Sequence, residues 1–295
     1  MHSKTINLVH RCAVWFGAVV LALAAGVAAA RETACPQHYA AGQAPRIINP
    51  KLLSRTAELC FTAFGVVHSG LYRTPLWSAE HLTRERLGRA KQQVRENAFH
   101  EEGGLAASDR SELRDFARSG LDRGHLAPSA DMPSAATQYE SFSLANMIPQ
   151  EPDNNRNLWE GIESAVRTLA KQRGELYVIS GPLFLAKQLR MLNGRVYVPT
   201  QIFKVVYDPQ RGAAAYLVDN AAGMDYRVVP VAHIEQMAGI SLLPGVTAEV
   251  KATAMQLPIP TPHGNKSAGN TTHRGTPSAH DASRVAMKAL RTIFR

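Results

Sequence analysis

Hydrophobic residues recur at intervals of three and four along the segment 155–173. The positions that share this spacing are Leu158, Ile162, Val166 and Leu169. Because an α-helix repeats every 3.6 residues, the spacing predicts a helix with one apolar face. Gly174 follows at once and is typical of the residue just beyond a helix end. We therefore expect a helix from Asn155 to Arg173.

Shorter runs of β-branched and aromatic residues surround this helix and predict strands. They lie at 46–49, 59–67 and 76–82 before it, and at 176–182, 196–198, 201–207 and 213–219 after it. Turn-forming residues at 208–212 would join the last two strands as a hairpin. Further helical patterns occur at 84–94, 111–117, 132–142 and 230–238. Together these runs predict an α+β fold, a mixed α/β domain with a central antiparallel sheet.

The first 30 residues have the pattern of a secretory signal peptide. Lys4 and Arg11 give a positive start, 13–29 is apolar and rich in alanine, and small residues precede Arg31. The alternative is an uncleaved membrane anchor, because the apolar run approaches spanning length. We expect an exported protein, periplasmic or secreted, whose mature chain does not span a membrane.

Residues 251–295 differ in composition from the rest of the chain. They are rich in Pro, Thr, Ser, Gly and His, which predicts a disordered tail with a basic end. Residues 31–250 then form one domain, long enough to bury a sizeable core.

Charge is distributed unevenly along the chain. The formal net charge is +9, of which two positive charges lie in the signal and six net positive charges lie in the tail. The domain 31–250 is therefore close to +1, which excludes a strongly basic surface as the basis for binding nucleic acid. Any polyanion must be held by a local group of arginines.

Three cysteines occur in the sequence, and Cys12 lies in the signal. Cys35 and Cys60 remain as an even pair in an exported protein, which makes a disulfide between them plausible. The alternative is two unpaired, buried thiols.

The motif most suggestive of chemistry is Asp122-Arg123-Gly124-His125. Arg123 offers a planar fork suited to phosphate. Gly124 would allow an unusual backbone conformation or a close approach to a ligand. His125 has the side chain best suited to act as a general base near neutral pH. Taken alone, the motif fits an ordinary surface loop equally well.

A second group lies on the predicted helix, where Asn155, Trp159, Glu163 and Arg167 are spaced by four residues. This spacing places them along one stripe. Ordinary structural roles are also open: Asn155 as a helix N-cap, Trp159 as a core anchor, and Glu163 with Arg167 as a surface ion pair.

Taken together, these motifs resemble those of the DNA/RNA non-specific endonuclease family, one branch of the ββα-metal (His-Me finger) nucleases. The matching parts are Asp122-Arg123-Gly124-His125 with Ala127-Pro128, the run Asn146-Met147-Ile148-Pro149-Gln150, and the pattern Asn155, Trp159, Glu163. They occur in the family's order, and the resemblance extends from about residue 73 to about residue 219.

The resemblance implies a role for each matching residue and a ββα-metal active site on the sheet. His125 matches the general base that activates water, and Asn155 matches the protein ligand of a hydrated Mg²⁺ ion, with Mn²⁺ or another divalent cation as alternatives. Glu163 matches the acid that orients the hydration water of the metal. The remaining matches are Arg123 and Arg167 beside the phosphate, Asn146 as a supporting asparagine, and Arg73, in a looser motif, as a further substrate arginine.

The resulting expectation is an exported, magnesium-dependent endonuclease acting on DNA and RNA. Every group recognises the phosphate backbone and none reads a base edge, so little sequence preference is expected. Two alternatives stay open: a non-catalytic nucleic-acid-binding protein with the same fold, and a phosphodiesterase acting on smaller substrates. The sequence implies no protein partner and leaves the oligomeric state open.

Overall fold

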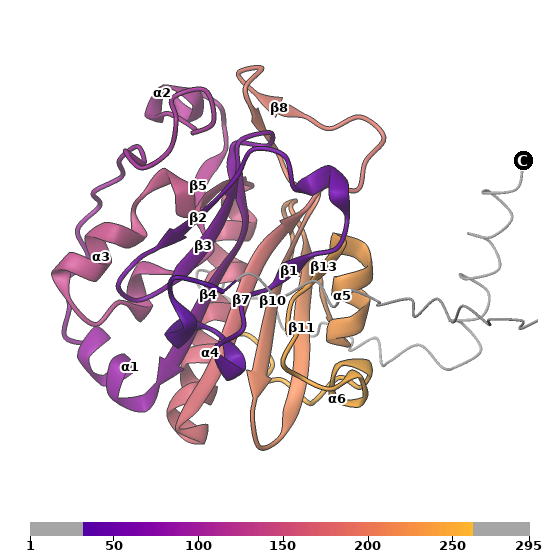
Figure 1. Ribbon diagram of the computed structural model, residues 1–295. Coiled ribbons are helices and arrows are strands. Elements are labelled where there is room, and N and C mark those ends of the chain that lie inside the picture. Colours follow the sequence, from indigo (N-terminus) through magenta and orange to yellow (C-terminus); the bar gives the residue numbers. More distant parts are fainter. Residues whose placement is uncertain (1–31, 262–295) are drawn as a thin grey trace, which may run out of the picture. The chain divides into compact units, whose positions relative to one another are not determined.

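The computed structural model describes residues 32–261 (Figure 1). The predicted signal peptide and residues 262–295 of the predicted tail lie outside the described residues. Within the described part, no helix combines the length and hydrophobicity needed to cross a membrane.

A seven-stranded sheet forms the centre of the fold, with the strand order β12-β11-β10-β7-β4-β3-β2. Every neighbouring pair is antiparallel, so the predicted central antiparallel sheet is confirmed. The strands are β2 (Thr56–Cys60), β3 (Gly65–Ser69), β4 (Thr74–Thr83), β7 (Glu175–Leu183), β10 (Gln201–Asp208), β11 (Gly212–Asp219) and β12 (Tyr226–Val229).

Helices cover both faces of this sheet (Figure 1). Because side chains alternate along a strand, Leu82 and Val178 pack with Ile162 of helix α4 (Glu160–Arg173) on one face. On the other face, Ala79 and Ile179 belong to a core shared with helix α5 (Val231–Ala238). Each fully buried aliphatic side chain contributes roughly 1.5–3 kcal/mol, so the apolar stripe of α4 is what attaches this helix to the sheet.

A smaller strand, strand and helix unit lies against the α4 face. Strand β5 (Asp122–His125) pairs antiparallel with β6 (Met147–Gln150). A π-helical segment, η6 (Asn154–Trp159), follows β6 and continues into α4. The chain leaves α4 at Gly174, whose φ of +100° is open to glycine. The ββα arrangement implied by the resemblance is therefore present. The first part of the predicted helix is π-helical.

The other elements are short. They are η1 (Pro36–His38), η2 (Ala40–Gly42), β1 (Arg46–Ile47), η3 (Pro50–Leu52), α1 (Arg84–Ala90), α2 (Leu113–Phe116), η4 (Ser129–Asp131), α3 (Ala135–Ser141), η5 (Leu144–Asn146), β8 (Met191–Leu192), β9 (Val196–Tyr197), β13 (Ile240–Ser241) and α6 (Ala248–Ala252). Helix α1 lies on the same face as α4, and β8 pairs with β9 as a hairpin.

The boundary predicted for the tail is too early. After α6, the backbone N–H of Met255 donates to the carbonyl of Ala213 at 2.9 Å, and the Tyr216 hydroxyl donates to the carbonyl of Pro258 at 2.5 Å. Leu257 is buried in the core beneath α4. Composition alone predicted disorder here because it does not reveal that single apolar residues find a place beside β11.

Cys35 and Cys60 are both free thiols in the structure. They are nevertheless neighbours, since Cys60 is among the groups that raise the pKa of the Cys35 thiol, after burial. Cys35 is buried and Cys60 is exposed. The predicted disulfide between them stays a prediction.

Candidate active site

The candidate active site is a cleft of about 970 Å³ beside the ββα unit. Three stretches of chain supply its walls: 95–99, 113–130 and 155–167. The residues that line it are Arg95, Asn97, Phe99, Leu113, Phe116, Ala117, Arg118, Leu121, Asp122, Arg123, His125, Pro128, Ser129, Ala130, Asn155, Arg156, Glu160, Glu163 and Arg167. The structure therefore brings together five predicted site residues, namely Arg123, His125, Asn155, Glu163 and Arg167.

His125 ends strand β5 and is only 9% exposed. Its ring packs against Phe99 and Phe142, with ring centroids 5.7 Å and 4.9 Å away. Burial, together with the charges of Arg95 and Arg123, lowers the pKa of the imidazole to about 3. The ring is therefore neutral at physiological pH and able to accept a proton. A phosphate bound in the cleft would offset the arginine charges and raise this pKa again.

Trp159 and Lys204 hydrogen-bond to the backbone at His125 and Leu126. The indole nitrogen of Trp159 donates to the His125 carbonyl at 3.3 Å. Lys204, which is fully buried, donates to the carbonyl of Leu126 at 3.4 Å and to the hydroxyl of Ser180 at 2.6 Å. Its ammonium also lies 5.0 Å from the Trp159 ring centroid. Trp159 at the end of η6 and Lys204 of strand β10 thus hold the backbone that carries the imidazole.

Asn155 lies inside the π-helical segment, so the N-cap interpretation is wrong. Its side-chain Nδ2 donates to Oδ2 of Asp122 at 2.9 Å. The same carboxylate accepts two hydrogen bonds from Arg156, at 2.8 Å and 2.7 Å. Because Nδ2 is engaged, the amide oxygen Oδ1 is the atom that Asn155 can offer to a ligand.

Glu163 and Arg167 do not form the surface ion pair considered from the sequence. Glu163 is 9% exposed, and burial raises the pKa of its carboxyl to about 7. Its Oε1 is buried without a hydrogen-bond partner. Arg167 is instead paired with Asp131, with Nη1 at 3.1 Å from Oδ1. A cation in the cleft would favour the charged form of Glu163.

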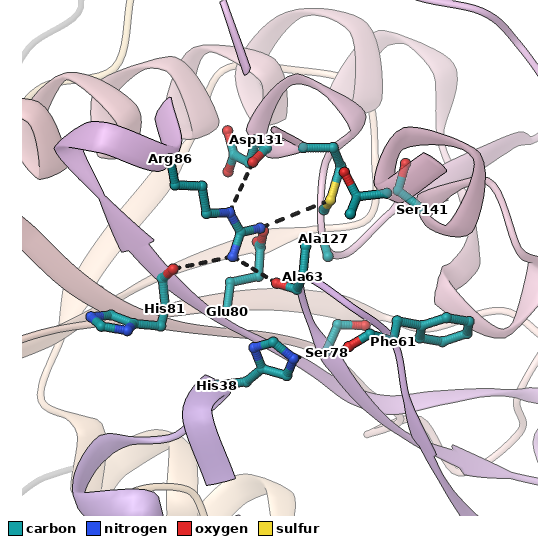
Figure 2. Close-up of polar contacts among 12 residues, drawn as sticks. His38, Phe61, Ala63, Ser78, Glu80, His81, Arg86, Ala127, Asp131 and Ser141 are labelled. Carbon is teal, nitrogen blue, oxygen red and sulfur yellow. Dashed lines mark hydrogen bonds and ion pairs between the residues drawn. The ribbon is translucent and has the colours of Figure 1, made fainter. Parts of the chain in front are cut away.

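A buried arginine, Arg86, holds the backbone of Asp131, the partner of Arg167, and Figure 2 shows its contact with Asp131. Arg86 donates to the backbone carbonyls of Asp131 at 3.0 Å and Ala63 at 2.6 Å. Its Nη2 also lies 3.0 Å from Oε1 of the buried Glu80. Since the Asp131 backbone is fixed by Arg86, the Asp131 side chain is positioned to hold Arg167.

Asn146 does not line the cleft, and its role is structural support. It is fully buried and donates to the carbonyls of Ala127 at 2.8 Å and Ser141 at 2.9 Å. Its Oδ1 accepts from the Ser78 hydroxyl at 2.8 Å and from the Ala127 N–H at 3.0 Å. All its amide groups are used to fasten the loop after His125 to strand β4.

Gly124 is needed because strand β6 passes close to it, and not for an unusual backbone conformation or a ligand. It sits in strand β5 and is not among the glycines with positive φ. A Cβ at this position would lie 1.9 Å from Oε1 and 2.7 Å from Cβ of Gln150. The close approach is therefore to the neighbouring strand β6 and not to a ligand.

Arg73, which was predicted to bind substrate, does not line the cleft, and its role in binding substrate stays a prediction. Its backbone has a φ of +53°. The guanidinium donates to the carbonyls of Ser108 at 3.1 Å and Arg195 at 2.9 Å. These contacts join the partly exposed side chain of Arg73 to the segment before α2 and to the turn between β8 and β9.

Several residues at or beneath the cleft were missed by the sequence reasoning. They are Arg95, Arg118, Asp122, Asp131, Arg156 and Lys204. Asp122 belongs to the motif Asp122-Arg123-Gly124-His125, but the sequence did not reveal that its carboxylate orients Asn155. The sequence around Arg95 is a charged stretch typical of a solvent-exposed segment. A lysine in a strand, such as Lys204, is likewise usually exposed, so neither residue was predicted to lie at the site.

The donor set suits a hydrated magnesium ion. Magnesium retains several waters and needs few protein oxygens. Oδ1 of Asn155 and the orphaned carboxylate oxygen of Glu163 are oxygen donors of that kind. Among residues 32–261, no three His, Cys, Asp or Glu side chains gather as a metal site.

Comparison with known proteins adds an independent observation. Endonuclease G, mitochondrial, of Homo sapiens is 33% identical over 196 residues, covering 60% of this chain and 66% of that protein. Nuclease 1, mitochondrial, of Schizosaccharomyces pombe is 32% identical over 199 residues, covering 59% of this chain and 62% of that protein. The chain thus spans slightly less than two thirds of the length of these relatives.

A crystal structure of the EndoG/EndoGI complex, concerned with the mechanism of EndoG inhibition, resembles the fold with a TM-score of 0.58 and 26% identity. The match covers 65% of this chain and 88% of that chain. A sequence profile of the DNA/RNA non-specific endonucleases matches residues 43–249, a range that contains the whole cleft. On these grounds the chain belongs to the DNA/RNA non-specific endonuclease family.

Proposed function

We propose that this protein is an exported, metal-dependent endonuclease that hydrolyses phosphodiester bonds of DNA and RNA with little sequence preference. The observation that carries the proposal is the position of His125. Its buried, neutral imidazole shares one cleft with the amide of Asn155 and with the guanidinium groups of Arg123 and Arg167.

His125 acts as the general base in this proposal. It accepts a proton from the water that attacks phosphorus, a role that contributes about 10²–10⁴-fold to the rate. Trp159 and Lys204 keep its backbone in place during the reaction. The neutral state of the ring is maintained by burial and by the neighbouring arginines.

Arg123 and Arg167 bind the phosphate group. The Arg123 guanidinium lies over the Phe99 ring, 4.1 Å from its centroid, which fixes its plane and leaves its N–H edge available. Paired N–H donors match phosphate oxygens. Because these contacts address the backbone only, the base sequence has little influence on binding.

Asn155 would hold Mg²⁺, with Mn²⁺ or another divalent cation as alternatives, and Glu163 would orient the hydration water of the ion. The ion, when bound, supplies positive charge that stabilises the negative charge developing on the phosphate. Asp122 keeps the Asn155 amide oriented, and Lys204 and Arg167 act electrostatically on the Glu163 carboxylate. The proposed substrates are DNA and RNA, and export would place the protein in the periplasm or outside the cell.

The test is digestion of circular plasmid and of structured RNA by the protein from residue 31, with magnesium and with a chelator. A circle has no ends, so cutting it demonstrates endonuclease action. His125→Ala is expected to lose almost all activity while keeping the melting temperature of a folded protein. Folded wild type that binds DNA but cuts neither polymer with any common divalent cation would show a binding protein. Turnover confined to small phosphodiesters would show the smaller-substrate enzyme.

A further inference from the structure

Helix α4 carries two oppositely charged cleft residues one turn apart. Glu163 and Arg167 have the spacing at which a carboxylate and a guanidinium on a helix ordinarily pair, and both line the cleft. Arg167 is nevertheless paired with Asp131. Oε1 of Glu163 is buried without a hydrogen-bond partner among residues 32–261. Some feature of the fold therefore decides between the two pairings.

The backbone of Asp131 is held at both of its polar groups. Asp131 ends η4, where its N–H donates to the carbonyl of Pro128 at 3.0 Å. Its own carbonyl accepts from Nε of Arg86 at 3.0 Å (Figure 2). Arg86 is fixed in turn, because its Nη1 donates to the carbonyl of Ala63 at 2.6 Å. The Asp131 carboxylate therefore has a narrow range of positions.

Burial makes the Asp131 carboxylate depend on Arg167. The side chain of Asp131 is only 4% exposed, and a buried carboxylate costs free energy unless a cation and hydrogen bonds compensate it. Its Oδ1 accepts from Nη1 of Arg167 at 3.1 Å. Burial lowers the pKa of the Arg167 guanidinium, but the nearby charges of Asp131, and then Glu163, raise this pKa overall. Asp131 thus attracts Arg167 more strongly than Glu163 does.

The bond to Asp131 fixes one corner of the Arg167 guanidinium. A guanidinium is planar and carries five N–H donors, so a hydrogen bond at Nη1 restricts its rotation while the fork has further donors to offer a phosphate. Without Asp131, Arg167 would be free to pair with Glu163 one turn away. That ion pair would occupy two groups that have separate tasks in the proposed reaction.

We propose that Asp131 is a positioning residue of the reaction, which holds Arg167 towards the phosphate and keeps it from neutralising Glu163. Arg86 of helix α1 supports Asp131 through its backbone carbonyl. This inference rests on the proposed nuclease function and adds a residue that lies outside the motifs Asp122–His125, Asn146–Gln150 and Asn155–Glu163.

Steady-state cutting of a short fluorescent DNA duplex gives the first measurement. Asp131→Ala is expected to lower kcat about tenfold or more, because a displacement of about 1 Å in a positioned group can cost about 100-fold. KM should not rise, since the cleft gains net positive charge. Asp131→Asn keeps an oxygen acceptor for Arg167, so its kcat should lie between those of wild type and Asp131→Ala. The asparagine variant also serves as the test if the alanine variant does not fold.

A double-mutant cycle tests whether Asp131 acts through Arg167. In the Arg167→Ala background, Asp131→Ala should change kcat by less than about twofold, because residues that act through one another are not additive. Asp208→Ala is the matched control. Asp208 is likewise buried, and its Oδ2 lies 3.6 Å from Nε of Arg173 on the same helix α4, but neither residue lines the cleft. This control should lower the melting temperature and leave kcat unchanged.

Nuclear magnetic resonance reports the state of Arg167 without any cutting. A guanidinium held by a carboxylate rotates slowly about its C–N bonds, so its Nη protons give separate signals. Arg167→Lys identifies these signals by their loss. They should be separate in wild type and in Asp208→Ala, and they should merge in Asp131→Ala. Neither metal nor nucleic acid is present, so the measurement does not depend on the nuclease function.

Two results would overturn the proposal. Equal losses of kcat from Asp131→Ala in the wild-type and Arg167→Ala backgrounds would show that Asp131 supports the fold independently of Arg167. Merged Nη signals in wild type, or separate signals in Asp131→Ala, would show that Asp131 does not hold the guanidinium. A wild type that cuts no nucleic acid would contradict the nuclease proposal, while the Nη signals would still decide the pairing of Arg167.

Discussion

Asp122 accepts a hydrogen bond from the side-chain amide of Asn155 at 2.9 Å. The contact joins the first strand of the ββα unit to its helix and orients the Asn155 amide with its oxygen free. Arg156 holds the other edge of the same carboxylate. Asp122 is therefore a positioning residue for the proposed metal ligand.

Replacing Asp122 by alanine should weaken metal binding without unfolding the protein. Loss of a partner that orients a metal ligand typically costs 10–100-fold in affinity or activity. We expect the Mg²⁺ concentration for half-maximal cutting to rise at least tenfold in Asp122→Ala. A magnesium titration of plasmid cutting provides the measurement.

Arg156→Ala is the control for this variant. It removes a charged partner of Asp122 but leaves the bond to Asn155 intact. Its magnesium requirement should change far less than that of Asp122→Ala. Equal magnesium requirements in the two variants would contradict the positioning role.

Trp159, the last residue of η6, donates from its indole nitrogen to the backbone carbonyl of His125. Trp159→Phe keeps an aromatic ring but leaves the His125 carbonyl without its donor, which costs about 1–3 kcal/mol when the group is buried. We expect lower stability towards urea and a fall in kcat larger than the change in KM. A variant with lower stability but unchanged kcat would show that the bond stabilises the fold only.

The pKa of His125 predicts an acid-sensitive fold. Burial first, then Arg95 and Arg123, lower this pKa from 6.5 to about 3. Below pH 6.5 the unfolded chain binds a proton that the folded protein does not. The free energy of unfolding therefore falls as pH decreases from 6.5 towards 3, by about 1.4 kcal/mol per pH unit for one such group.

His125→Gln removes this contribution and keeps a polar side chain. Between pH 4.5 and 6, its free energy of unfolding should depend less steeply on pH than that of wild type, by about one proton. Urea denaturation at several pH values measures the difference. The other described histidines with lowered pKa, namely His38, His68 and His233, are present in both proteins and cancel in the comparison. Parallel curves would refute the assignment.

The neighbouring thiols of Cys35 and Cys60 should form a disulfide in an oxidising compartment. With oxidised glutathione as the oxidant, two thiol hydrogens are lost and one S–S bond forms. Closing this loop stabilises the fold by about 3 kcal/mol in the chain-entropy treatment. Mass spectrometry after alkylation should find both cysteines unlabelled.

Cys60→Ser provides the comparison for stability. Wild type should melt at a higher temperature without reductant than with it, whereas the melting temperature of Cys60→Ser should be the same in both conditions. Full alkylation of both cysteines in the oxidised wild type would show that the thiols stay free.

The sequence alone predicted the α+β architecture and five of the residues that line the candidate active site. The α4 helix, the hairpin of β10 and β11 and the antiparallel sheet follow from the periodicity of hydrophobic residues, which depends on each element by itself. His125, Asn155, Glu163, Arg123 and Arg167 were identified because their motifs are short and local, and the structure brings all five to one cleft.

Only the tertiary structure decided which charges face the substrate. Arg73 was expected at the phosphate, yet it does not line the cleft and donates to the carbonyls of Ser108 and Arg195. Arg95 looked like part of a solvated stretch, yet it lines the cleft. A guanidinium reaches several ångströms from its backbone, so its direction depends on which acceptors the folded chain places around it.

The burial of Lys204 beneath the site also depends on residues that are distant from it in the sequence. Lys204 lies on a strand whose sequence gives no sign of a charged interior, and its burial becomes tolerable because Ser180, Leu126 and the Trp159 ring meet it from other elements. Burying a charge costs free energy unless partners surround it. Those partners are far apart in the sequence, so the fold alone could bring them together.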